Sequence, residues 1–116
     1  MKGTRPLRVS RTDRPDGVVV LELAGELTVL TRDLLPDPDP DSPRVLVDTS
    51  GLKHIDTPGL ATLVRLAGSC AKRGGRLVVI GLDADIQDMR HHLFLDEALL
   101  FADDVEAAVT LVSTGS

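Results

Sequence analysis

The 116-residue chain has room for one domain, and its 42% apolar and 27% charged residues are ordinary values for a globular protein. It has 13 Lys and Arg against 18 Asp and Glu, a formal net charge of -5, and Phe94 and Phe101 as its only aromatic residues. This acidic, aromatic-poor composition argues against nucleic-acid binding, and no apolar run approaches the ~20 residues of a membrane span. A single cysteine excludes an internal disulfide, and no secretory signal is recognisable, so we expect a cytoplasmic protein.

The first part of the chain predicts two strands joined by a turn. Residues 7–9 are a short strand candidate, and Pro15-Asp16-Gly17 is a turn signal. Residues 18–23 are β-branched and apolar, which favours a second strand, and residues 24–27 are expected to end it.

The next segment leaves little room for a helix. Residues 28–35 have room for at most two helical turns. In residues 36–43 nearly every second residue is proline, which removes amide donors and disfavours helical backbone at the preceding position. We therefore expect an extended, solvated Asp-Pro loop there.

The centre of the chain predicts a buried strand, a turn and a helix. Residues 45–48 are the strand, residues 49–51 the turn, and residues 58–72 the helix, which Gly74-Gly75 ends. One apolar stripe runs along this helix at helical spacing. Its members are Leu60, Leu63, Val64, Ala67, Cys70 and Ala71.

The last part of the chain continues the alternation of strands and helices. Residues 76–82 and 99–101 predict strands, and a helix capped by Asp83 or Asp85 is expected between them. Asp103-Asp104 is expected to cap a final helix before a frayed tail. The residues expected to face inward on these two helices are Ile86, Met89, Leu93 and Phe94, then Val105, Ala108, Val109 and Val112.

Strands that alternate with helices imply right-handed crossovers and a parallel sheet. The predicted fold class is therefore α/β: one domain over residues 1–116, with a core at 7–112 and a tail at 113–116. Its sheet is mixed but mostly parallel, with four or five strands, and its first helix is shortened or replaced by the loop at 36–43.

Most residues with chemical potential favour a structural interpretation. Cys70 lies on the inward stripe and is expected to be a small buried hydrophobe. His91 and His92 are adjacent, so on a helix they cannot share one metal ion. The acids at 37–41 lack the glycine and glutamate of an EF-hand calcium loop. We find no phosphate-binding loop and no acid-base pair, and expect no metal, no cofactor and no enzymatic activity.

The informative segment is residues 55–60. Proline favours the first helical position, which makes Thr57 the expected N-cap and places Asp56 beside the positive end of the helix dipole. Two interpretations stay open. Thr57 is only a cap, whose replacement by alanine costs about 1 kcal/mol. Alternatively, Thr57 accepts a phosphate, whose charge of about −1.5 to −2 repels a docked partner without unfolding the domain. The spacing by itself favours the cap.

The same residues resemble a known family. Residues 45–52 and 55–60 look like the central motif of STAS domains, whose best-known members are bacterial anti-sigma factor antagonists. Gly25-Glu26-Leu27 resembles the family's motif after its second strand, and residues 72–79 resemble its Gly-Gly turn and following strand. The resemblance spans residues 7–112.

The resemblance implies a phosphorylation cycle. An unphosphorylated antagonist binds an anti-sigma factor that is also an ATP-dependent serine/threonine kinase, and a sigma factor is freed. The kinase then phosphorylates the antagonist at the start of its second helix, which matches Thr57 here, and a phosphatase resets the cycle. The partner-binding residues implied by the resemblance are Gly25, Glu26, Thr28, Asp56, Pro58, Gly59 and Leu60.

This chain departs from the family pattern at three places. Thr57 stands where serine is usual, Pro58 replaces a small polar residue, and Thr28 followed by the Asp-Pro loop replaces an aspartate and a full helix. The alternative is a STAS scaffold that is not phosphorylated and associates with a lipid-type ABC transporter or a signalling complex. A small-ligand binder or enzyme is a third alternative, which only generic surface features support.

Overall fold

The computed structural model describes residues 7–35, 44–81 and 99–114. Its five strands form one sheet in the order β1-β2-β3-β4-β5, in which β1 is antiparallel to β2 and every other pair is parallel. The strands are β1 (Arg8–Asp13), β2 (Val19–Leu27), β3 (Arg44–Ile55), β4 (Arg76–Ile80) and β5 (Leu100–Phe101). The helices are η1 (Arg32–Leu34), α1 (Thr57–Lys72) and α3 (Val105–Thr114). The predicted α/β class with a mixed, mostly parallel sheet is confirmed.

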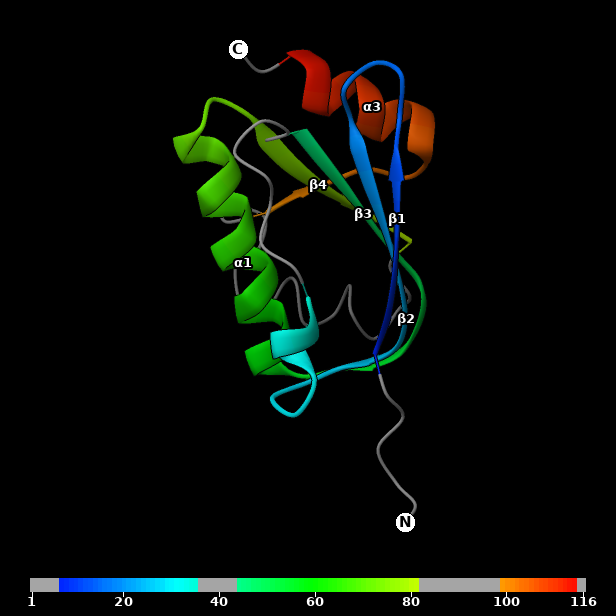
Figure 1. Cartoon of the computed structure of the whole chain (residues 1–116), viewed down its shortest axis with the longest axis vertical. Coiled ribbons are helices and arrows are strands. Elements are labelled where there is room, and N and C mark those ends of the chain that lie inside the picture. Colours follow the sequence, from blue (N-terminus) through cyan, green and yellow to red (C-terminus); the bar gives the residue numbers. More distant parts are fainter. Residues whose placement is uncertain (1–6, 36–43, 82–98, 115–116) are drawn as a thin grey trace.

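The sheet lies between α1 on one face and α3 on the other (Figure 1). Side chains alternate between the two faces along each strand. Leu21 and Leu23 of β2 pack in the cluster under α1, whereas Val18 and Leu46 pack with Ala108 of α3. Two aliphatic cores therefore hold the domain, one on each face of the sheet.

The first three strands are longer than predicted, whereas β4 and β5 are shorter than the predicted strands at 76–82 and 99–101. Residues 11–13 extend β1 because they pair with residues 19–21 of β2, and the turn follows at Gly17, which has a positive φ of 87°. Residues 49–51, predicted as a turn, continue β3 to Ile55, and the register with β2 shifts beside them. Thr49 is buried there, and its hydroxyl donates to the carbonyl of Ile80 at 2.8 Å. That bond satisfies a polar side chain inside a strand.

The helices follow the predicted faces with three differences. α1 carries Leu66 in the core, and its predicted core residue Ala71 is exposed. Asp104 caps α3 as expected, because its Oδ1 accepts from the Ala107 amide at 2.8 Å. Val105, predicted inward, is 41% exposed at the first helical position.

Two further predictions fall outside the described residues, namely the loop at 36–43 and the helix begun by Asp83 or Asp85, which carries His91 and His92. Within the described ranges, no helix is long and apolar enough to cross a membrane.

Candidate phosphoacceptor and partner-binding surface

The first turn of α1 presents Thr57 at the surface. Asp56, not Thr57, is the N-cap: its backbone is extended, and its Oδ1 accepts from the Gly59 amide at 2.8 Å. The predicted N-cap was therefore wrong by one residue, because a carboxylate makes a stronger, charge-assisted cap than a hydroxyl. Thr57 and Pro58 become the first two helical residues. The exposed Thr57 hydroxyl consequently has no capping role.

Asp56 also ties α1 to the segment that follows β2. Its Oδ2 accepts from the amide of Val29 at 3.1 Å, and its own amide donates to the carbonyl of Leu27 at 3.2 Å. One half-buried carboxylate thus joins residues 27 positions apart in the sequence. In Figure 1 this segment, drawn in cyan, lies against the first turn of α1.

Gly59 and Leu60 contribute to the core under the site. Leu60 is 2% exposed and belongs to the cluster under α1. Gly59 is buried because its Cα faces the carbonyl oxygen of Leu27, and an added Cβ would overlap with that oxygen. These two predicted partner-binding residues are therefore buried, and they support the helix start from the core side of α1. Of the predicted residues on α1, Thr57 is exposed and Pro58 is half-buried.

Gly25, Glu26 and Thr28 shape the end of β2. Gly25 has a positive φ of 97° beside the register shift between Gly25 and Glu26, a conformation that glycine adopts at little cost. The Glu26 carbonyl accepts from the Thr31 hydroxyl at 2.6 Å. Thr28 is buried, and its Oγ1 accepts from the Leu30 amide at 3.2 Å. Half-buried Gly25 and Glu26 remain candidates for direct partner contact, whereas Thr28 holds the following turn.

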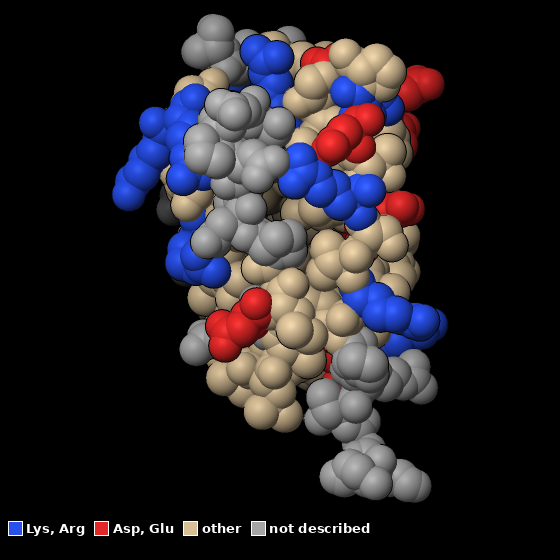
Figure 2. Space-filling view, viewed as in Figure 1, with Lys and Arg blue, Asp and Glu red and all other residues tan. Residues whose placement is uncertain are grey.

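Residues 28–34, which we name the apolar turn, expose large aliphatic side chains that were not predicted as site residues. Val29, Leu30 and Leu34 are 51%, 74% and 57% exposed. The surface at the lower end of the described residues in Figure 2, where Figure 1 places the apolar turn, is mostly uncharged. Clustered exposed aliphatic side chains are typical of interaction sites. The sequence left room for at most two helical turns over residues 28–35, and it predicted neither a buried nor an exposed face for them.

Cys70 lies away from this surface, in the core under α1. Burial raises the pKa of its thiol from the ordinary 9.0 to about 11, against the opposing charge of Arg73. We therefore predict that a thiol reagent at pH 8 modifies Cys70 only after denaturation. The unfolded thiol loses its proton near pH 9 and the folded one near 11, so stability should fall as pH rises through this window. Rapid labelling of the native protein would contradict the buried placement.

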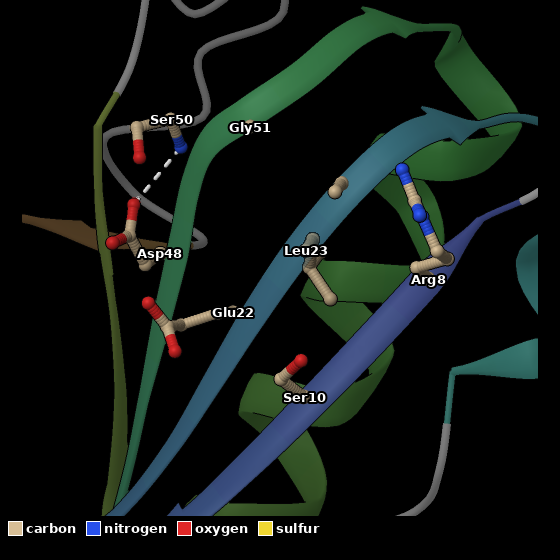
Figure 3. Close-up of a pocket in the computed structure, with 8 residues that line it drawn as sticks. Arg8, Ser10, Glu22, Leu23, Asp48, Ser50 and Gly51 are labelled. Carbon is tan, nitrogen blue, oxygen red and sulfur yellow. Dashed lines mark hydrogen bonds between the residues drawn. The ribbon is translucent and has the colours of Figure 1, made fainter.

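A hollow of about 360 Å³ lies on the α3 face of the sheet, beyond the part that α3 covers. Figure 3 shows the side chains of Glu22 and Asp48 on adjacent strands, with Arg8 further along. Asp48 Oδ1 already accepts from the Ser50 amide at 2.9 Å. Within the described residues, no three His, Cys, Asp or Glu side chains gather as metal ligands. The hollow resembles the solvated part of a half-covered sheet, and none of the predicted site residues lines it.

Comparisons with known proteins agree with the predicted family. A family model described as "Mlab, STAS domain" matches residues 10–102. Among solved structures, an anti-sigma factor antagonist from Mycobacterium paratuberculosis superimposes with a TM-score of 0.76 at 20% identity, covering 91% of this chain and 93% of that one. The antagonist SpoIIAA in its unphosphorylated form gives a TM-score of 0.65 at 13% identity, covering 92% and 99%.

The same fold also matches part of a much larger protein. A murine anion transporter of the Solute Carrier 26 family gives a TM-score of 0.68 at 17% identity, covering 83% of this chain but only 18% of the transporter. No curated protein sequence matches the chain significantly. At identities this low, the superpositions establish only the shared fold. The role of the chain has to be inferred from its own residues.

Proposed function

Because the chain belongs to the STAS domain family, we propose that it is an anti-sigma factor antagonist. In this proposal it works in the bacterial cytoplasm as a non-enzymatic binding module that regulates transcription. It sequesters an anti-sigma factor that is also an ATP-dependent serine/threonine kinase, and phosphorylation at Thr57 switches it off. A phosphatase restores the binding form. The likeness to two antagonists over more than nine tenths of this chain supports the proposal.

The observation that carries the proposal is the position of Thr57. Its side chain is exposed at the first position of α1, next to the residue that holds the apolar turn. A partner that buries Leu30 and Val29 covers the neighbouring helix start too, because a standard interface spans about 800 Å² on each protein. In this arrangement the apolar side chains provide the affinity for the partner. The Thr57 hydroxyl lies beside them, where an added phosphate weakens binding.

The chemistry of the proposed switch needs only a free hydroxyl on this chain. The kinase transfers the γ-phosphoryl group of ATP to Thr57: the Oγ1–P bond forms, the bond from phosphorus to the β-phosphate oxygen breaks, and ADP leaves. The hydroxyl proton passes to a base of the kinase. The phosphatase uses water to break the Oγ1–P bond, which regenerates the hydroxyl and releases inorganic phosphate.

The phosphorylated domain is expected to stay folded. A phosphate at the first helical position meets the positive end of the α1 dipole, which stabilises negative charge. A partner surface closed over Thr57 instead has to desolvate a charge of about −1.5 to −2. Release therefore needs no unfolding of the antagonist.

We predict that Thr57→Glu weakens partner binding at least tenfold, because an unpaired interfacial charge costs more than about 1.4 kcal/mol. The measurement is a pull-down from the native cell with wild type and Thr57→Glu as baits, followed by titration of the purified partner. Thr110→Glu, an exposed site on α3, is the matched control. With ATP, mass spectrometry should find one phosphoryl group on Thr57. The proposed switch would be wrong if a kinase-like partner bound wild type and Thr57→Glu equally, or if it left Thr57 unmodified in the presence of ATP.

The likeness to an anion transporter favours one second candidate. In that role the chain is a scaffold bound constitutively to a transporter or signalling complex. Thr57→Ala and Thr57→Glu would then leave the complex intact, and transporter subunits in place of a kinase would be recovered with both baits.

A further inference from the structure

We propose that Asp56 couples the state of Thr57 to the apolar turn, so that a phosphate on Thr57 releases this turn from α1. The inference rests on the proposed function, since it concerns how the same site is regulated. It assigns Asp56 the part of a positioning residue: the carboxylate contacts the helix start and the turn at once.

The apolar turn is held internally at every amide near its start except one. The Thr28 amide donates to the Thr31 hydroxyl at 3.0 Å, and the Leu30 amide donates to the Thr28 hydroxyl at 3.2 Å. The Val29 amide between them instead donates to Asp56 Oδ2 at 3.1 Å. The orientation of the turn relative to α1 thus depends on a bond that its own residues do not supply.

Asp56 sits where a phosphate on Thr57 acts most directly. The two residues are neighbours in the chain, and the carboxylate already binds the Gly59 amide of the first turn. A phosphate at the first helical position repels this carboxylate and competes for the same N-terminal amides. Either effect draws Asp56 away from the Val29 amide. The turn then keeps its internal bonds and the contact of η1 with α1, but it loses the hydrogen bond that joins Val29 to the helix start.

Release of the turn adds a second effect to charge repulsion. Val29 and Leu30 are among the most exposed aliphatic side chains of the described residues, and a partner has to find them in one position. Loosening the turn forces the partner to order it at a cost in affinity. The switch therefore acts on the apolar contact as well as on the phosphorylated residue.

The test is amide hydrogen exchange by NMR on the whole chain, unmodified and with phosphothreonine at residue 57, without any partner. We expect the Val29 amide to exchange about fivefold faster in the phosphorylated protein, the effect of losing one hydrogen bond. The Thr28 and Leu30 amides should change by less than about twofold, because their bonds lie inside the turn. Unchanged exchange at Val29, or an equal rise at all three amides, would overturn the proposal.

Asp56→Asn supplies the second arm. The amide oxygen can still cap the Gly59 amide, but the NH₂ group cannot accept from Val29. Val29 exchange should already be fast in this variant, and phosphothreonine at residue 57 should add nothing further, as in a coupled double-mutant cycle. An equal increase in both backgrounds would show that the phosphate does not act through Asp56. The exchange experiment contains no partner. Its result can therefore be interpreted even if the pull-down finds no kinase-like partner, so failure of the proposed function and failure of this coupling can be distinguished.

Discussion

Replacing Gly59 with alanine is expected to lower the free energy of unfolding by about 3 kcal/mol, the upper end of the usual cost of overpacking. The added Cβ overlaps with the carbonyl oxygen of Leu27 and lies 3.1 Å from the Leu27 Cγ atom. Backbone cannot rotate away as a flexible side chain does, so the start of α1 has to move off β2. Urea denaturation followed by circular dichroism measures the loss.

Gly68→Ala is the matched control on the same helix. Gly68 is exposed in the middle of α1, and no atom of another part of the described chain lies within 4 Å of an added Cβ. This substitution should stabilise the protein by about 0.5 to 1 kcal/mol, through helix propensity alone. Equal effects of the two substitutions would contradict the close approach of Gly59 to β2.

The position of the helix start that carries the candidate site was predictable because its signals are local. Pro58 marks a helix start, and the apolar stripe from Leu60 onward gives the helix its inward face. The capping residue was not predictable in the same way. Asp56 and Thr57 are both good N-caps, and Asp56 has a second partner in Val29 that lies far away in the sequence. The stronger carboxylate cap and this tertiary contact together favour Asp56 over Thr57.

The exposed apolar turn escaped prediction for a related reason. Valine and leucine normally indicate burial, so nothing in the sequence marked Val29, Leu30 and Leu34 as surface residues. The segment instead closes on itself through the Thr28 and Thr31 side chains, which leaves room only for the three-residue η1. The extension of β3 through Gly51 was also not predicted. A shift in strand register uses the same small and polar residues as a turn, so a single sequence does not distinguish the two.

Leu27→Ala is expected to destabilise the protein by about 3 kcal/mol, within the usual range for a buried leucine. The Leu27 side chain is 0% exposed at the end of β2, in the cluster under α1. Its removal leaves a cavity beneath the helix start, next to the Gly59 backbone. The Asp56 amide donates to the Leu27 carbonyl at 3.2 Å, so loosening at Leu27 also disturbs the candidate site.

Leu30→Ala separates stability from binding at the same end of the molecule. Leu30 is three residues further along and 74% exposed, so its truncation should change the free energy of unfolding by less than about 0.5 kcal/mol. Partner affinity should nevertheless fall about tenfold, since burial of a leucine contributes about 1.5 kcal/mol or more to an interface. Denaturation curves and titration of the partner test the pair. A Leu30→Ala protein that binds as tightly as wild type would remove the apolar turn from the interface and leave Thr57 to a different docking geometry.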